Sequence, residues 1–382
     1  MIAQTEATDV KKRPAGTGPV RSAMRLLPAG TFVLAAVCQS GLLPLDDLGF
    51  SARTVLSLLA ACLVFVTVFM VLRNAEAVAH HVGEPYGTLV LTLAVTAIEV
   101  SVIISMMLHG ENNPTLARES VFSTVMIVCT GVVGVCLTFG GWRHLHQDII
   151  RQGTSSYLGV MIALTVLTLV LPNFTLTTSP GTFSPLQLAF VSTLSLLLYS
   201  AFVFAQTVRH RGDFVGDVDS HHEDAADAAA EALAPNIVLL VLGLTGIVLL
   251  TELIAGSIED GLAALRVAQS DAIVGAFIAT LVLMPEAVSA IKWALRNDLQ
   301  RSMNVALGSA CATIGLTIPA VSAASLITGR GLTLGLESGD TVLLLLALAI
   351  SVISFGTGRT TVLTGLVHLV VFGAYLFLIF VP

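Results

Sequence analysis

The chain has 382 residues and a net charge of -7; 55% of its residues are hydrophobic and only 11% are charged. Its mean hydropathy is +0.90. Soluble domains carry about 25% charged residues, so this composition excludes an ordinary soluble protein.

The apolar residues fall in blocks of about 17–27 residues, the length that crosses ~30 Å of hydrocarbon as a helix. These blocks lack the alternation of polar and apolar residues that marks membrane β-barrels. The sequence therefore predicts an all-α polytopic membrane protein with about eleven transmembrane helices. The predicted spans are 27–44, 53–72, 85–108, 119–140, 157–172, 185–208, 235–256, 270–291, 303–327, 341–355 and 360–381.

The loops between these spans differ in charge, and this difference predicts how the chain is oriented. Cytoplasmic loops of membrane proteins are enriched in Lys and Arg. With a cytoplasmic N-terminus, the 18 Lys and Arg residues all lie on the cytoplasmic side except Arg53, Arg118, Arg266 and Arg330. We therefore expect a cytoplasmic N-terminus and, because the number of spans is odd, a C-terminus on the opposite side.

A hydrophilic acidic stretch divides the chain into two parts with five spans each. The expected order is a tail (1–26), a leading helix (27–44), a first five-helix repeat (53–208), an acidic linker (209–234) and a second five-helix repeat (235–382). Five spans are an odd number, so the two repeats cross the membrane in opposite orientations, as the inverted repeats of secondary transporters do. The linker acids are Asp213, Asp217, Asp219, Glu223 and Asp224. They belong either to a solvated tether between the repeats or to a regulatory sensor.

Two carboxylates lie in the interior of predicted spans. Glu99 stands in "LTLAVTAIEVSVIISMML" and Glu286 stands in "FIATLVLMPEAVSAI". A charged acid at the centre of a membrane helix costs about 2.5–3.5 kcal/mol on insertion scales. No Lys or Arg lies centrally in any span to neutralise the two acids. We therefore expect them to meet near the midplane, where they are protonated, reached by water or bound to a cation.

Such a pair can bind either protons or a metal ion. Burial disfavours the charged form of a carboxyl group, whereas a bound cation favours it. Competition between the two ligands at one site is what a proton-coupled antiporter requires. Two carboxylates match the charge of one divalent ion, and hard oxygen ligands suit Ca²⁺. Further oxygen ligands are expected from the hydroxyls of Thr96, Ser289, Ser123 and Ser309 and from the Val282 carbonyl, with Ser101, Thr124 and Thr313 as other hydroxyls nearby.

Each of the other ionisable residues in or near the spans has two possible roles, except His368. Glu252 and Glu76 lie at related places in the two repeats, where they relay protons to the centre or bond neighbouring helices. Glu84 and Asp271 each precede a central glutamate by fifteen residues. They either lie at solvated helix N-termini, which the helix dipole favours, or form part of a vestibule that attracts cations. His368 lies within the last span, where we expect it to bond a neighbouring helix.

The segments "RNAEAVAHHVGEPYGTLVLTLAVTAIEVSVI" and "DAIVGAFIATLVLMPEAVSAIKWALRNDLQRSMNVALGSACATIGLTIPAV" resemble the cation/proton exchanger (CAX) family of calcium/cation antiporters, in particular its bacterial ChaA-like branch. The resemblance covers nearly the whole chain after the first span. It implies calcium/proton exchange, with sodium and potassium also associated with the branch, and it matches the family's cation-binding glutamates to Glu99 and Glu286. The family's Gly-Asn-Ala-x-Glu signature reads Val95-Thr96-Ala97-Ile98-Glu99 in one half and Val282-Leu283-Met284-Pro285-Glu286 in the other.

The sequence thus predicts a Ca²⁺/H⁺ antiporter of the bacterial inner membrane that exports cytosolic Ca²⁺ by alternating access. Its expected partners are membrane lipid and inorganic cations, with no nucleic acid and no cofactor, and a homo-oligomer is left open. A sodium or potassium antiporter is the alternative, since one carboxylate suffices for a monovalent ion. A cation channel would place its acids by oligomeric symmetry, whereas one chain supplies both here. An enzyme is not expected, because HExxH is absent and no His lies near either glutamate.

Overall fold

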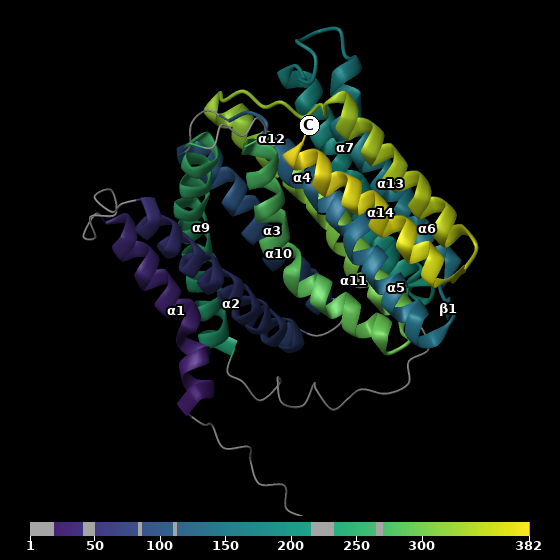
Figure 1. The fold of residues 1–382 in the computed structure, drawn as a ribbon, viewed down its shortest axis with the longest axis horizontal. Coiled ribbons are helices and arrows are strands. Elements are labelled where there is room, and N and C mark those ends of the chain that lie inside the picture. The colour runs from purple at the N-terminus through teal and green to yellow at the C-terminus, as the bar shows by residue number, and fades with distance from the viewer. Residues whose placement is uncertain are drawn as a thin grey trace, which may run out of the picture.

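The computed structural model of the chain describes residues 19–40, 50–82, 86–109, 113–214, 233–264 and 270–381, and these residues form an almost entirely helical bundle (Figure 1). A leading helix, α1 (Pro19–Gln39), precedes two sets of five membrane-crossing segments. Two very short strands, β1 (Gln147–Asp148) and β2 (Arg359–Thr360), pair in antiparallel orientation.

The two sets follow the same plan, in which the third crossing of each set contains a π-helical segment. The first set comprises α2 (Phe50–Val82), α3 (Tyr86–His109), α4 (Leu116–Met126) with η1 (Ile127–Val132) and α5 (Val133–His144), α6 (Arg151–Thr165) with η2 (Val166–Val170) and η3 (Leu171–Phe174), and α7 (Pro185–Phe204) with η4 (Ala205–Arg209) and η5 (Arg211–Asp213). The second comprises α9 (Leu233–Ala264), α10 (Ser270–Leu295), α11 (Leu299–Ala312) with η6 (Thr313–Thr317) and α12 (Ile318–Thr328), α13 (Ser338–Gly356) and α14 (Val362–Phe380). The expected fold of one leading helix and two inverted five-helix repeats is therefore present.

The described helices account for the predicted spans. Of these segments, 9 are long and apolar enough to cross a membrane, and two shorter apolar stretches, Met24–Gln39 in α1 and Thr92–Met107 in α3, complete the set. The largest difference in boundaries is in α2, which continues to Val82, past the predicted span 53–72. The sequence "RNAEAVAHH" is polar but rich in helix-forming residues, so the helix extends beyond its apolar part.

The helices divide into two bodies. The small body consists of α1, α2 and α9, which contact one another, and the large body consists of α4–α7 and α11–α14. Each body has its own cluster of buried apolar side chains, and α3 and α10 contribute to both clusters. In Figure 1, α3 and α10 accordingly lie between α1, α2 and α9 on one side and α5, α6, α13 and α14 on the other. The two helices that carry the central glutamates thus lie at the boundary between the bodies.

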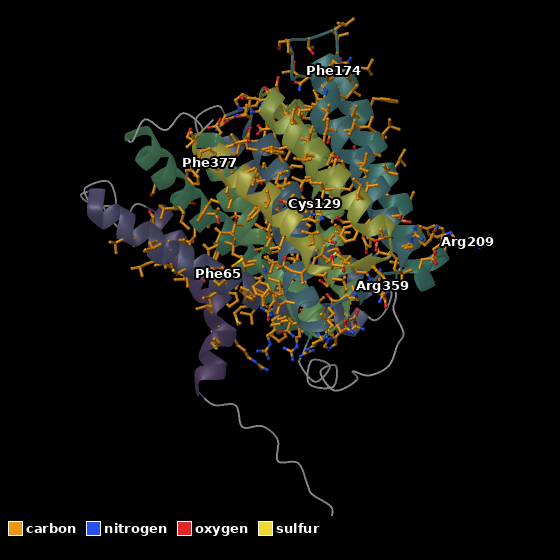
Figure 2. All side chains as sticks on the ribbon, turned by 45° about the vertical axis from the view of Figure 1, so that its right-hand side comes forward. Phe65, Cys129, Phe174, Arg209, Arg359 and Phe377 are labelled. Carbon is orange, nitrogen blue, oxygen red and sulfur yellow. The ribbon has the colours of Figure 1, made fainter. Side chains whose placement is uncertain are left out.

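Backbone pairing ties the two repeats together at both ends of the large body. The linker end of the bundle, formed by residues 145–150, 210–214, 296–298 and 357–361, holds the β1–β2 pair and an exposed ion pair between Asp148 and Arg359 at 3.2 Å. The far end, formed by residues 113–115, 175–184 and 329–337, holds an isolated bridge between Thr182 and Thr333. Figure 2 shows Arg209 and Arg359 at the linker end and Phe174 at the far end. Because both ends are tied, the large body is suited to act as one rigid unit.

Candidate cation site

Glu99 lies in the interior of α3, where the helix meets the second repeat. Its side chain is buried, with the whole residue only 2% exposed. Thr313, the first residue of the π-helical segment η6, donates a hydrogen bond of 2.7 Å from its Oγ1 to Oε2 of Glu99. The other oxygen, Oε1, is also buried and has no hydrogen-bond partner among the described residues. A buried polar atom without a partner is costly, so this oxygen marks a place where a ligand would be stabilised.

Glu286 occupies the related position on α10, directly after Pro285. The residue is partly buried, and its Oε2 atom is buried and lacks a hydrogen-bond partner within the described part of the chain. Glu286 lies close enough to Glu99 and Glu76 for their charges to interact. Two carboxylates from opposite repeats are thus brought together, and each has one oxygen that no protein group satisfies.

A cavity of about 1080 Å³ reaches Glu286 from the linker end. Near the glutamate, its wall includes Thr96, Ser289, Ser309 and Thr313, and Glu76 also lines it. Towards the linker end, the wall is formed by loop and helix-start residues that include Asp148, Asp298, Gln300 and Arg301. The cavity therefore connects a polar mouth at one end of the bundle with Glu286 and with Thr313, the hydrogen-bond partner of Glu99; Glu99 itself lies behind this wall.

The predicted auxiliary ligands divide into two groups. Thr96, Ser289 and Ser309 line the cavity, as an oxygen-rich cation site requires. Val282, whose backbone carbonyl is the predicted ligand, is not among the residues that line the cavity; its side chain packs in the apolar cluster of the small body, with the residue 5% exposed. Ser123 is also absent from that wall, because it lies in the far half of its span and is hydrogen-bonded to Tyr375.

The other acidic residues lie at different places. Glu76, on α2, is exposed to the cavity near Glu286. Asp271 begins α10 at the far end and accepts a 2.7 Å hydrogen bond from Thr115, so it does not belong to this cavity. Asp213 lies in η5, 3.7 Å from His210. Glu84, the side chain of Glu252 and the linker acids Asp217, Asp219, Glu223 and Asp224 lie outside the described residues.

His368 bonds neighbouring helices, as expected. Its Nδ1 donates a 2.7 Å hydrogen bond to the carbonyl of Cys129 in η1, and its Nε2 lies 3.0 Å from the Ser354 hydroxyl. Figure 2 places Cys129 in the middle of the large body. The histidine therefore satisfies a backbone carbonyl in the π-helical segment and joins α14 to α13.

Several cavity residues did not stand out in the sequence. Asn304 accepts a 3.0 Å hydrogen bond from Gln300 and donates to the carbonyl of Phe214, which anchors the start of the linker beside the cavity. The spacing of four between Gln300, Asn304 and Gly308 places them on one helix face and could have indicated a polar wall. Tyr199 also lines the cavity, and no pattern within α7 alone would have distinguished it.

The donor set is that of a site for hard cations. In the part of the chain that the structure describes, no group of three or more His, Cys, Asp and Glu side chains is arranged to hold a metal. The two glutamates and the surrounding hydroxyls instead offer oxygen atoms only, which suit calcium or alkali cations rather than soft metals.

Comparisons with known proteins show the family and the fold of the chain. Residues 53–208 and 235–381 match the family model described as sodium/calcium exchanger protein. The chain is 41% identical over 358 residues to the protein y4hA of Sinorhizobium fredii, covering 94% of this chain and 95% of that one. It is 36% identical over 332 residues to the sodium-potassium/proton antiporter ChaA of Escherichia coli, covering 85% and 88%. The crystal structure of an H⁺/Ca²⁺ exchanger, CAX, shares the fold, with a TM-score of 0.67, 15% identity and coverage of 93% and 89%.

Proposed function

Because this chain belongs to the sodium/calcium exchanger family, a family of membrane-spanning transporters, we propose that it exchanges Ca²⁺ for protons across the bacterial inner membrane. The observation that carries the proposal is the pair of glutamates from opposite repeats. Glu99 and Glu286 each have a buried oxygen that no described protein group satisfies, and a polar cavity reaches Glu286 and Thr313, the hydrogen-bond partner of Glu99, from one end.

The cargo ion binds between the two carboxylates. Their combined charge neutralises one divalent cation, and the hydroxyls of Thr96, Ser289 and Ser309 supply further oxygen ligands, with water completing the six to eight ligands that Ca²⁺ takes. Thr313 holds Oε2 of Glu99 and leaves Oε1 free for the ion.

Protons and the cation compete for these carboxylates. When Ca²⁺ leaves, the two negative charges face each other in a low-dielectric environment, and protonation removes their repulsion. Glu76 lies on the cavity wall near Glu286 and passes protons between the cavity and the site. The exchange is therefore coupled, because the site releases one ligand on binding the other.

Alternating access follows from the two bodies. The cavity opens at the linker end, which the distribution of Lys and Arg places in the cytoplasm. At the far end, Arg118 donates hydrogen bonds to Glu119 and, at 3.0 Å, to the carbonyl of Gly335. Movement of the small body against the large body, on which α10 packs through α4 and α11, would close the cavity and open a path at the far end, and a bound ion would then leave the cytoplasmic side.

We propose that the acidic linker also regulates this cycle. Phe214, which lies near the start of the linker, is buried against Tyr157 and Phe202, and its carbonyl accepts the bond from Asn304 of the cavity wall. Cation binding to Asp217, Asp219, Glu223 and Asp224 would act on the cavity through this anchor.

A monovalent cargo is the second candidate, and the 36% identity to a sodium-potassium/proton antiporter favours it. The test is proton flux in everted vesicles after addition of CaCl₂, NaCl or KCl, together with uptake of radioactive Ca²⁺ driven by a proton gradient. The proposal predicts flux with CaCl₂. Flux with NaCl or KCl and none with CaCl₂ would assign a monovalent cargo, and Ca²⁺ movement unaffected by collapse of the proton gradient would indicate a channel.

A further inference from the structure

Three cations and a tryptophan form a basic patch at the linker end of the bundle, around the turn between α10 and α11. The patch consists of Lys292, Trp293, Arg296 and Arg301. The guanidinium carbon of Arg301 lies 4.2 Å from the centroid of the Trp293 ring, and that of Arg296 lies 5.3 Å from the same centroid. One partly buried indole ring thus holds two arginines near each other through cation–π contacts.

The backbone of this turn fixes where the arginines begin. The carbonyl of Trp293 accepts hydrogen bonds of 3.0 Å from the amides of both Arg296 and Asp298. Asp298 in turn caps α11, because its side chain accepts a 3.0 Å hydrogen bond from the amide of Arg301. Both guanidinium groups are therefore attached to an ordered turn and rest on the same ring.

The patch carries more positive charge than its surroundings balance. Asp298 lies 3.4 Å from Nε of Arg301 and compensates one charge. Among the described residues, neither Lys292 nor Arg296 forms an ion pair with a carboxylate. All three cations are exposed, so the patch can bind an anion from outside the protein.

The patch lies at the membrane surface, beside the mouth of the cation cavity. Arg301 lines this mouth, whereas Lys292, Trp293 and Arg296 are not part of the cavity wall. The turn directly follows the span Ser270–Leu295, so it lies at the depth of the lipid headgroups. The distribution of Lys and Arg places this end in the cytoplasm, where the membrane leaflet carries anionic lipids.

We propose that Trp293, Arg296 and Arg301 bind the phosphate group of an anionic phospholipid in the cytoplasmic leaflet. A guanidinium group donates two parallel hydrogen bonds to phosphate oxygens, and two such groups on one ring can bind one headgroup. Tryptophan side chains are enriched at this depth because the ring is apolar and its N–H is polar. The bound phosphate lies beside the route by which cations enter the cavity.

Trp293 itself can report the binding. The chain has two tryptophans, so Trp142→Phe leaves Trp293 as the single one. The full-length protein in an uncharged detergent is titrated with phosphatidylglycerol or phosphatidylcholine that carries a nitroxide near the glycerol end of an acyl chain, which quenches a nearby indole. We expect phosphatidylglycerol to quench Trp293 at a concentration at least about fivefold lower than phosphatidylcholine, since one arginine near an anionic lipid surface contributes about this factor.

Substitutions in the patch test the assignment. Arg296→Gln and Arg301→Gln should each reduce the preference for phosphatidylglycerol, and the double variant should lose it, with quenching expressed relative to the lipid-free fluorescence of each variant. The control Arg143→Gln removes an exposed cation at the same end of the bundle but outside the patch, and should leave the preference within about twofold of the parent.

Two results would overturn the proposal directly: equal quenching by the two lipids in the parent, or a preference that persists in the double variant. Displacement of phosphatidylglycerol by an excess of inorganic phosphate would also overturn it, because the patch would then be a site for free phosphate. The measurement uses no transport, so loss of exchange in the glutamate variants bears on the proposed function alone.

Discussion

Thr313 of the second repeat donates a hydrogen bond of 2.7 Å to Glu99 of the first repeat. The donor is the first residue of a π-helical segment, and such segments occur frequently at functional sites. This bond fixes Oε2 of the Glu99 carboxylate. The other oxygen, Oε1, is buried and has no hydrogen-bond partner among the described residues. The π-helical segment η6 thus positions the carboxylate that α3 carries.

Replacement of Thr313 by valine removes this hydroxyl while keeping the shape of the side chain. We expect Thr313→Val to raise the KM for the transported cation about three- to tenfold, because Glu99 loses the donor that orients it. The control is Thr317→Val in the same π-helical segment, since the Thr317 hydroxyl is buried without a partner among the described residues. Equal effects of the two substitutions on the KM would contradict a positioning role for Thr313.

The sequence predicts the helices well, and it also predicts that Glu99 and Glu286 lie inside them, because both features are local. Blocks of apolar residues mark the crossings, and a carboxylate within such a block is conspicuous at Glu99 and Glu286. The contacts between repeats are not local. Ser123 and Ser309 are chemically identical, and only the packing of α14 and the position of the cavity show that one is bonded to a tyrosine while the other faces the site. The Val282 carbonyl stays a predicted ligand, because the packing of the Val282 side chain in the apolar cluster does not bear on its backbone oxygen.

Glu76 is the acid through which we expect protons to enter the site. Glu76→Gln should lower the rate of proton-coupled exchange about tenfold or more. A side chain that is positioned for general acid–base catalysis raises a rate by a factor of this size or larger. Equilibrium binding of Ca²⁺ to the purified protein should change less than threefold, because Glu99 and Glu286 remain. The matched control is Glu337→Gln, whose side chain is 68% exposed at the far end. A large loss of Ca²⁺ binding in Glu76→Gln would instead make Glu76 a ligand.

Binding of Ca²⁺ should weaken as the pH falls. Each carboxylate that must lose a proton before the ion binds makes the Kd rise about tenfold per pH unit in the range where that carboxylate is protonated. With two carboxylates, the expected rise is between about ten- and a hundredfold per unit at acidic pH. Titration calorimetry of the purified protein at a series of pH values measures this slope, and a Kd independent of pH would exclude competition between protons and the ion.

Close packing between the repeats should be sensitive to one methyl group at Gly365. A Cβ added there would lie 2.4 Å from the backbone nitrogen of Thr138, so α14 would have to move away from α5. We expect Gly365→Ala to destabilise the protein by about 1–3 kcal/mol, measured as a lower Tm. Gly373 lies on the same helix with nothing within 4 Å of its added Cβ, so Gly373→Ala should leave the Tm unchanged or raise it. A Tm unaffected by Gly365→Ala would show that α14 does not pack as described.

The central claim is that Glu99 and Glu286 together form the site at which cation and proton compete. The most direct measurement is Ca²⁺-dependent proton flux in everted vesicles containing the wild-type protein, Glu99→Gln, Glu286→Gln or the control Glu337→Gln, at matched protein levels. The account predicts flux by the wild type and the control and a loss of at least tenfold in each central variant. Normal exchange by both Glu99→Gln and Glu286→Gln would contradict it.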